Sequence, residues 1–85
     1  SRDILKIVVS LIQEKGYAVN NIDATVICEQ PKIAPYTEKM IKNIAEDCLC
    51  ELSQINIKAT TTEGLGFTGR SEGIAAQAIC IIKAL

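Results

Sequence analysis

Histidine and tryptophan are absent from the sequence, and the aromatic residues are limited to one Phe and two Tyr. Without histidine the chain lacks the usual general base and the commonest ligand of transition metals. Any chemistry must therefore use carboxylates, hydroxyls, backbone amides or groups supplied from elsewhere. The four cysteines form no CxxC pair, which leaves no zinc site of the Cys/His type. We expect all four to be reduced thiols, and Cys28 and Cys80 to be small buried hydrophobic residues.

Clusters of basic charge and long apolar runs are missing as well. The formal net charge is −1 over 85 residues, and the basic residues are too scattered for a nucleic-acid footprint. No apolar run reaches the roughly 18 to 20 residues of a transmembrane helix. We therefore expect no nucleic-acid partner and no membrane association. The length suits one small domain, residues 1–85, and domains of this size often gain stability by oligomerising.

The first third of the chain predicts a helix followed by a strand. Residues 1–15 have helical periodicity, with an apolar stripe formed by Ile4, Ile7, Val8, Leu11 and Ile12. Asn20-Asn21 predicts a turn. Apolar and polar residues then alternate over residues 22–28, which is typical of a strand. Pro31 ends that strand, because proline cannot continue the hydrogen-bonded ladder.

The remainder of the chain predicts a second helix and a second strand. Pro35 is suited to the first turn of a helix, whose apolar stripe consists of Met40, Ile41, Ile44, Ala45, Cys48 and Leu49. Residues 55–60 alternate as a short strand. Residues 74–85 fit a helix, because of their alanines, or a strand buried on both faces, because residues 79–82 are consecutively apolar. This order of elements indicates an α+β layer with helices on one face of a sheet.

The loop after the second predicted strand is the first candidate site. Thr60, Thr61 and Thr62 place three hydroxyls at the strand end, and Glu63 and several glycines follow. Hydroxyls and backbone N–H groups suit phosphate oxygens, and a neighbouring carboxylate suits a hard divalent cation. Glycines let the backbone approach a ligand closely. The spacing indicates phosphate binding, although threonine is also common in ordinary strands, and the GxxxxGK[ST] pattern of a Walker loop is absent.

Two further segments are candidates that also have a purely structural interpretation. Arg70 can hold an anion, or it can form a surface ion pair with Glu72 worth about 0 to 1 kcal/mol. Phe67 can line an apolar pocket or a subunit contact, or it can plug the loop. The turn at residues 28–34 can read the edge of a nucleobase through main-chain groups, or it can simply connect two elements, which the pattern alone favours.

The run KATTTEGLGFTGRSEGIA, residues 58–75, closely resembles the C-terminal signature of the 2-C-methyl-D-erythritol 2,4-cyclodiphosphate synthase family. SRDILKIVVSLIQEKGYAVNNIDATVI resembles the helix and following strand of that family, and EQPKIAPY resembles its cytidine-binding turn. The resemblance covers the whole chain. It implies a ferredoxin-like α+β fold with helices packed on one face of a mixed β-sheet, of which this chain is the C-terminal part. Residues 74–85 are then a strand.

The resemblance also implies a reaction and an assembly. Members of the family are phosphorus–oxygen lyases of non-mevalonate isoprenoid biosynthesis. They convert 4-CDP-2-C-methyl-D-erythritol 2-phosphate to the cyclic diphosphate by metal-assisted intramolecular phosphoryl transfer: the 2-phosphate attacks the β-phosphorus and CMP is released. The resemblance implies a homotrimer with active sites at the subunit interfaces, located in the bacterial cytoplasm or, alternatively, in a plastid-type organelle.

Each candidate residue receives a role through this resemblance. The cytidine turn, which acts largely through backbone groups, comprises Cys28, Glu29, Gln30, Pro31, Lys32, Ile33 and Ala34. Thr60, Thr61 and Thr62 match the substrate-binding hydroxyls near the diphosphate, and Thr61 matches the residue that stabilises the transition state. Glu63 matches the ligand of a magnesium or manganese ion. Phe67 and Arg70 match substrate-site and trimer-axis positions. Arg70 with Glu72 also resembles the polar end of the central cavity, where family members can hold an isoprenoid diphosphate.

The zinc ligands of the family have no counterpart in this sequence. The resemblance places them, an Asp-x-His pair and a later histidine, in the N-terminal half of the subunit. We therefore expect the 85 residues to be the C-terminal half of a subunit and to be inactive alone. An alternative of another class is a non-catalytic α+β module for oligomerisation or small-ligand binding, which the size and near-neutral charge also fit. Such a module has no need for the Thr-Thr-Thr-Glu run and the Gly-Phe-Thr-Gly-Arg run that follows it.

Overall fold

The computed structural model describes residues 1–85, and its elements follow the predicted order. They are α1 (Arg2–Glu14), β1 (Tyr17–Ile27), η1 (Ala34–Tyr36), α2 (Thr37–Cys48), η2 (Leu52–Gln54), β2 (Ile55–Thr60), α3 (Gly66–Gly69) and β3 (Ala75–Ala84). The ambiguous C-terminal run is a strand, as the resemblance implied. None of the helices combines the length and the apolarity that a membrane-spanning segment needs.

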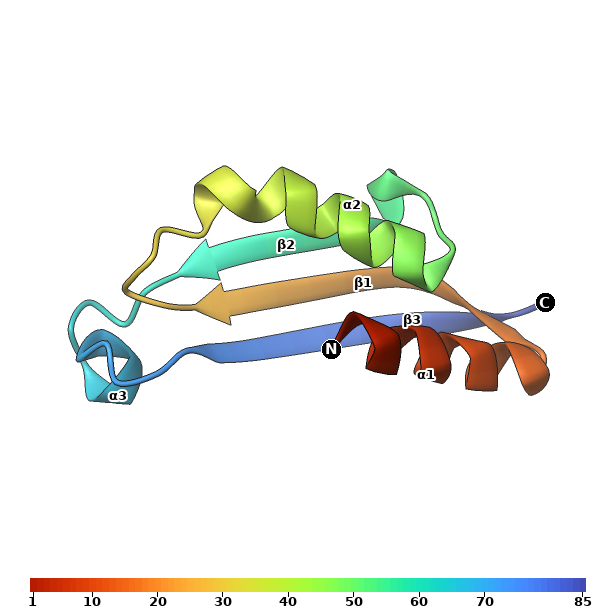
Figure 1. The fold of residues 1–85 in the computed structure, drawn as a ribbon, viewed down its shortest axis with the longest axis horizontal. Coiled ribbons are helices and arrows are strands. Elements are labelled where there is room, and N and C mark those ends of the chain that lie inside the picture. Colours follow the sequence, from red (N-terminus) through yellow and green to blue (C-terminus); the bar gives the residue numbers. More distant parts are fainter.

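The three strands form one mixed sheet in the order β2-β1-β3. β1 runs parallel to β2, with Ile22 opposite Ile55 and Ile27 opposite Thr60. β3 pairs antiparallel with the other edge of β1. Because β1 and β2 are parallel, their carboxyl ends lie side by side, and Figure 1 shows both arrowheads at the end of the molecule that carries α3.

The helices α1 and α2 cover one face of this sheet and enclose two small apolar clusters. Val9 of α1 packs with Val19 of β1 and Cys48 of α2. Ala45 of α2 packs on the β2 residues Ile55 and Ile57, with support from apolar residues of β1 that include Ile22, Ala24 and Val26. The arrangement confirms the predicted α+β layer with helices on one face of a mixed sheet.

The predicted inner stripe of α1 is wrong in detail. Ile4, Ile7, Val8 and Leu11 are all exposed, whereas Leu5, Val9 and Ile12 face the sheet. The helix is apolar on more than one side, so periodicity alone could not decide which side meets the core. Leu49 also leaves the predicted stripe of α2, because it takes a left-handed conformation at the helix end and is 70% exposed.

β3 differs from the expected strand buried on both faces. Apart from Ala75, all its residues are exposed within this chain, including Ile79, Ile81 and Ile82. The expectation that Cys80 is buried is therefore wrong for the chain taken alone. All four cysteines are free thiols, and burial raises the pKa of Cys48 to about 11, which keeps that thiol protonated at neutral pH.

The turn predicted at Asn20-Asn21 is replaced by an irregularity within β1. The strand is continuous from Tyr17 to Ile27, and its pairing with β3 shifts register between Val19 and Asn21. The extra residue of such a bulge leaves a backbone group without a ladder partner. Here the carbonyl oxygen of Asn20 accepts a hydrogen bond from Gln54 Nε2 at 2.6 Å.

A partly buried ion pair joins the two helices. The guanidinium of Arg2 donates from Nε and Nη2 to the two carboxylate oxygens of Asp47, at 2.8 and 2.7 Å. The Asp47 side chain is only 1% exposed, and Lys6 lies 3.8 Å from it. The hydrogen bonds from Arg2 lower the pKa of Asp47 below its ordinary value, despite the opposing effect of burial.

We predict that Asp47→Asn lowers the melting temperature of the purified protein by several degrees near neutral pH. The substitution keeps the shape of the side chain but removes the carboxylate charge that pairs with the Arg2 guanidinium. Because the folded-state pKa of Asp47 is lowered, its stabilisation is complete above the ordinary value of 3.8 and is lost as the pH falls through the folded-state value. Thermal melts of the variant and the parent at a series of pH values check this: their melting temperatures should approach each other as the pH falls into the acid range.

The matched control is Glu46→Gln, since Glu46 is 72% exposed and only 3.6 Å from the same Arg2 guanidinium. An exposed pair contributes about 0 to 1 kcal/mol, so this variant should melt close to the parent. Equal melting temperatures of Asp47→Asn and the parent at neutral pH would contradict the stabilising role of the pair.

Candidate functional site

The carboxyl ends of β1 and β2 border a hollow of about 380 Å³. The N–H of Cys28 donates to the carbonyl oxygen of Thr60 at 3.0 Å, which continues the parallel ladder one step past the last strand pair. The turn after β1 and the start of the loop after β2 therefore leave the sheet together. The hollow is lined by Cys28, Glu29, Lys32, Ile33, Ala34, Ala59, Thr60 and Thr61.

The turn at residues 28–34 is organised around the buried Cys28 thiol. Its Sγ donates to the carbonyl oxygen of Gln30 at 2.8 Å and lies 3.6 Å from that of Pro31, which follows a cis peptide bond. The backbone N–H groups of Lys32 and Ile33 make no hydrogen bond within the chain. The turn thus presents free main-chain donors beside the hollow, as reading a nucleobase edge requires.

The three hydroxyls of the threonine run point to different partners. Thr60 Oγ1 donates to the carbonyl oxygen of Thr61 at 3.3 Å. Thr61 Oγ1 accepts a hydrogen bond from the N–H of Glu63 at 3.2 Å, so the Thr61 hydroxyl proton remains free to donate. Thr62 Oγ1 donates to the carbonyl oxygen of Leu65 and lies 3.1 Å from the hydroxyl of Thr68. Thr61 is the available hydroxyl, and Thr62 holds the loop.

Glu63 carries an exposed carboxylate without a hydrogen-bond or ion-pair partner in the chain. Its backbone is left-handed, with φ of 53°, in the turn that Thr61 supports. A carboxylate and nearby hydroxyl oxygens are the hard donors that Mg²⁺ or Mn²⁺ prefers. No group of three Cys, Asp or Glu side chains comes together to hold a metal ion. A cation at Glu63 therefore needs further oxygens from a ligand, from water or from another part of the protein.

The loop folds back tightly through α3. Gly69 packs so closely that a Cβ atom there would lie 2.2 Å from the carbonyl carbon of Gly64. The N–H of Gly69 donates to the carbonyl oxygen of Leu65, and the N–H of Gly64 donates to Glu29 Oε1 at 3.2 Å. The glycine-rich segment is thus folded on itself and hydrogen-bonded to the turn.

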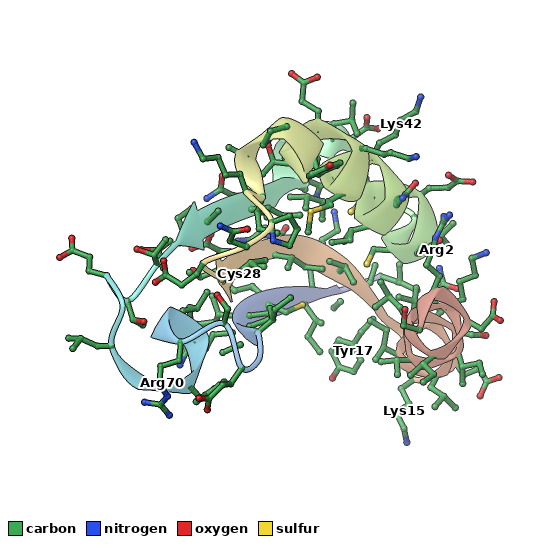
Figure 2. The ribbon with its side chains drawn as sticks, turned by 60° about the vertical axis from the view of Figure 1, so that its left-hand side comes forward. Arg2, Lys15, Tyr17, Cys28, Lys42 and Arg70 are labelled. Atoms are coloured by element: carbon green, nitrogen blue, oxygen red, sulfur yellow. The ribbon has the colours of Figure 1, made fainter.

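Arg70 and Phe67 lie apart from the hollow. Arg70 makes a two-point ion pair with Glu72, with Nε at 2.7 Å and Nη2 at 3.2 Å from its oxygens, and both side chains are more than half exposed. Figure 2 shows Arg70 at the outer edge of the molecule, away from Cys28. Phe67 is 51% exposed and lies against Gly73. Within this chain the structure brings together the turn and the threonine run, but not these two residues.

The sequence pattern of the YgbB family matches residues 1–83, which include the turn, the threonine run and the glycine-rich loop. The chain belongs to the YgbB family. A 2-C-methyl-D-erythritol 2,4-cyclodiphosphate synthase of Ectopseudomonas mendocina is 56% identical over 82 residues, which make up 96% of this chain and 52% of the relative. The resemblance inferred from the sequence is confirmed.

Solved structures of the same kind of enzyme share the fold of this YgbB-family chain. The synthase of Plasmodium vivax superimposes with a TM-score of 0.95 at 31% identity, covering 99% of this chain and 56% of that one. The CDP complex of IspF from Plasmodium falciparum gives 0.93 at 32% identity, covering 98% and 53%. The chain spans about half the length of the curated relatives it matches.

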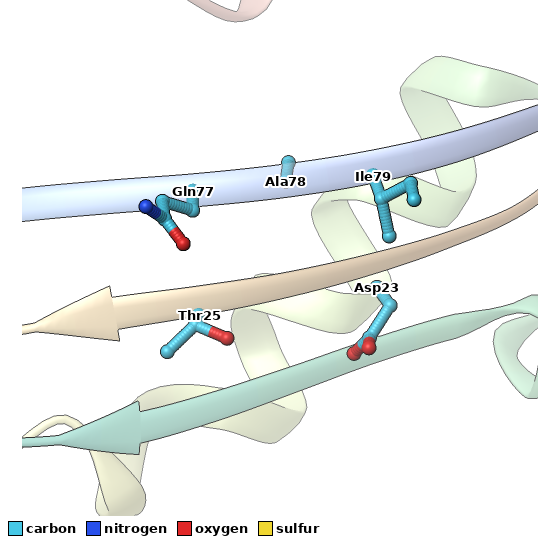
Figure 3. A pocket seen from close by; sticks show the side chains of 5 residues that line it. All are labelled: Asp23, Thr25, Gln77, Ala78 and Ile79. Carbon is cyan, nitrogen blue, oxygen red and sulfur yellow. The ribbon is translucent and has the colours of Figure 1, made fainter.

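A polar cluster that the sequence pattern did not predict lies on the face of the sheet opposite α1 and α2. Asp23 of β1 accepts hydrogen bonds from Asn56 Nδ2 at 2.9 Å and from Lys58 Nζ at 2.8 Å. These bonds, that of Lys58 first, lower the pKa of Asp23. The alternation of both strands places the three residues on one face, but their pairing depends on the register. A hollow of about 160 Å³ beside Asp23 is lined by Asp23, Thr25, Gln77, Ala78 and Ile79 (Figure 3).

We predict that Gly69→Ala disrupts the glycine-rich loop, because the added Cβ meets the backbone of Gly64. Overpacking of this kind costs about 1–3 kcal/mol. Hydrogen exchange of residues 61–69 should therefore quicken by about 5- to 150-fold, while the exchange of β1 is unchanged.

Gly73→Ala is the control for this loop prediction, because its Cβ would meet only the Phe67 side chain at 3.2 Å, and that side chain can move. Equal protection of the loop in the Gly69→Ala variant and the parent would contradict the close packing of Gly69 on Gly64.

Proposed function

We propose that the protein containing this chain is a 2-C-methyl-D-erythritol 2,4-cyclodiphosphate synthase. It converts 4-CDP-2-C-methyl-D-erythritol 2-phosphate to the cyclic diphosphate and releases CMP. The observation that carries the proposal is the hollow where β1 and β2 end together, because residues with unbonded backbone N–H groups, Lys32 and Ile33, and Thr61 with its free hydroxyl proton all line it. This is the pairing of nucleobase and phosphate contacts that a nucleoside diphosphate needs.

Two further observations support this assignment. Homologues and structural neighbours of the chain are cyclodiphosphate synthases, and one neighbour is a CDP complex. The chain spans only about half of those relatives, so the activity is proposed for the whole protein. We propose that the 85 residues alone lack it, because the relatives contain a further half that this chain does not supply.

The nucleotide side of the site is the turn at residues 28–34. We place the cytosine against its main chain, where the N–H groups of Lys32 and Ile33 are free to donate. Cys28, Gln30 and Pro31 maintain the turn through contacts of the buried thiol. Recognition by backbone groups explains how side chains as plain as those of Ile33 and Ala34 can line a specific site.

The phosphate side of the site is Thr60 and Thr61. The free hydroxyl proton of Thr61 can donate to an oxygen of the diphosphate as negative charge develops on it. In the proposed step a new P–O bond forms between the 2-phosphate and the β-phosphorus. The bond from the β-phosphorus to the bridging oxygen breaks, and CMP leaves with that oxygen. Such a transfer depends mainly on positioning and charge neutralisation, so no histidine base is needed in this segment.

The exposed carboxylate of Glu63 is the proposed ligand of a magnesium or manganese ion. When bound, that ion neutralises phosphate charge. Glu63 is suited to this because it has no partner in the chain and is held beside Thr61. A zinc ion is proposed for the other half of the subunit, where the family resemblance places its ligands.

The proposed assembly is a homotrimer with active sites between subunits. The small core and the exposed apolar residues of β3 support it, because a lone chain leaves Ile79, Ile81 and Ile82 in water. Arg70, Glu72 and Phe67 then lie at the trimer axis, where an isoprenoid diphosphate can be held. A bacterial cytoplasmic location is favoured over a plastid-type organelle by relatives such as that of Ectopseudomonas mendocina.

We predict that Thr61→Ala lowers kcat of cyclic diphosphate formation by about 10²- to 10³-fold with a smaller change in KM, as expected for the loss of a donor that acts in the transition state. Thr61→Ser keeps the hydroxyl and should retain most of the activity. The assay uses the intact protein and monitors CMP release. An inactive parent protein would refute the proposed function, and an unchanged kcat in the alanine variant would refute the role of Thr61.

We also predict that Glu63→Gln raises the concentration of Mg²⁺ or Mn²⁺ needed for half-maximal activity by about tenfold or more, because a neutral amide is a weaker ligand of a hard cation than a carboxylate. Glu14→Gln, at the far end of α1, removes the same charge from an exposed position as a control. A metal titration that superimposes on that of the parent would contradict this role of Glu63.

A further inference from the structure

A single side-chain hydrogen bond joins the nucleotide turn to the glycine-rich loop. Oε1 of Glu29 accepts from the backbone N–H of Gly64 at 3.2 Å, across 35 positions of sequence. The other side-chain hydrogen bonds of the turn are those from Cys28 to Gln30 and Pro31 within it, and that from Thr37 Oγ1 of α2 to the carbonyl oxygen of Ala34. Beyond the strand ends, Glu29 is therefore the only polar side-chain connection between the two halves of the site.

The bond from Glu29 is placed where it can fix the backbone of the glycine-rich loop. Gly64 directly follows Glu63, whose own N–H is held by Thr61 Oγ1 at 3.2 Å. Two successive backbone amides of the loop are thus fixed, one by the threonine run and one by the turn. Gly64 is also the residue on which Gly69 packs. Displacement of Gly64 would move the Glu63 carboxylate on one side and disturb the α3 packing on the other.

We propose that Glu29 is a positioning residue that clamps the phosphate-binding loop to the nucleotide turn. Its carboxylate accepts the Gly64 N–H, sets the distance between the base-binding and phosphate-binding parts of the hollow, and couples the order of one to the order of the other. The functional part of this inference rests on the proposed synthase activity. The clamp itself rests only on the contacts of Glu29 and Gly64.

The clamp requires a side chain at position 29 that is long enough to bring an acceptor oxygen to the Gly64 N–H. It does not require a negative charge. Glutamine has the same length and keeps an acceptor oxygen, whereas aspartate keeps the charge but is one methylene shorter. A residue that bound a cation directly would instead depend on its charge. Glu29→Gln and Glu29→Asp therefore separate the two roles, and neither introduces a large cavity, because Glu29 lies at the border of an open hollow.

The first experiment measures hydrogen exchange at the Gly64 amide in the intact protein without substrate. The parent and Glu29→Gln should protect this amide equally, whereas Glu29→Asp and Glu29→Ala should exchange it about fivefold faster or more. Glu72→Gln, which breaks the Arg70 ion pair in the same loop, is the matched control and should leave Gly64 unchanged. Equal protection in all variants, or loss of protection in Glu29→Gln, would overturn the clamp.

The second experiment measures how the two parts of the site influence each other. Affinity for CDP is determined with and without Mg²⁺, and activity is followed across a metal titration. Glu29→Asp should reduce the gain in CDP affinity that Mg²⁺ provides and raise the half-maximal Mg²⁺ concentration, each by about fivefold. Glu29→Gln should reproduce the parent in both. Unchanged coupling in Glu29→Asp, despite faster exchange at Gly64, would reduce Glu29 to a purely structural role and overturn the positioning role.

Failure of the clamp and failure of the proposed function give different results. If the parent protein forms no cyclic diphosphate, the proposed function fails, and the Gly64 exchange still decides whether the clamp exists. If the parent is active but Glu29→Gln is impaired as strongly as Glu29→Asp, the synthase assignment holds and the clamp is replaced by a role for the negative charge.

Discussion

The parallel pairing of β1 with β2 is the constraint on which the rest of the site depends. It places Ile27 opposite Thr60 and lets Cys28 continue the ladder, so that the turn and the loop leave the sheet as neighbours. A slip by one residue would turn the buried face of β2 toward solvent, so the apolar contacts beneath α2 fix the register. The small core therefore determines the geometry of the hollow, although no core residue lines the phosphate side.

The loop depends on a second, local set of contacts. The hydroxyls of Thr62 and Thr68 are hydrogen-bonded to each other inside the loop, and Gly69 packs on Gly64. With these residues engaged in structure, Thr61 and Glu63 are left with a free hydroxyl proton and a free carboxylate. The loop thus divides its polar residues between those that hold the backbone and those that remain available to a ligand.

Short-range patterns in the sequence predicted most of the fold and indicated which segments form the candidate site. Alternation located β2, the threonine run marked its end, and Pro31 marked the end of β1. Contacts between distant residues could not be predicted in this way. The Arg2–Asp47 pair and the Glu29–Gly64 bond join positions 45 and 35 residues apart, and the carbonyl of Asn20 at the bulge is bonded by Gln54, 34 residues away. The packed side of α1 was also missed, because the helix is apolar on more than one side and only the sheet decides between them.

We propose that one hollow binds the base at the turn and the phosphates at the threonine run. A crystal structure of the intact protein with CDP and Mg²⁺ tests it most directly. We expect the cytosine within hydrogen-bonding distance of the Lys32 or Ile33 backbone and a phosphate oxygen within hydrogen-bonding distance of the Thr61 hydroxyl. A nucleotide bound elsewhere, for example on the open face beside Asp23, or with its phosphates remote from Thr61, would contradict it.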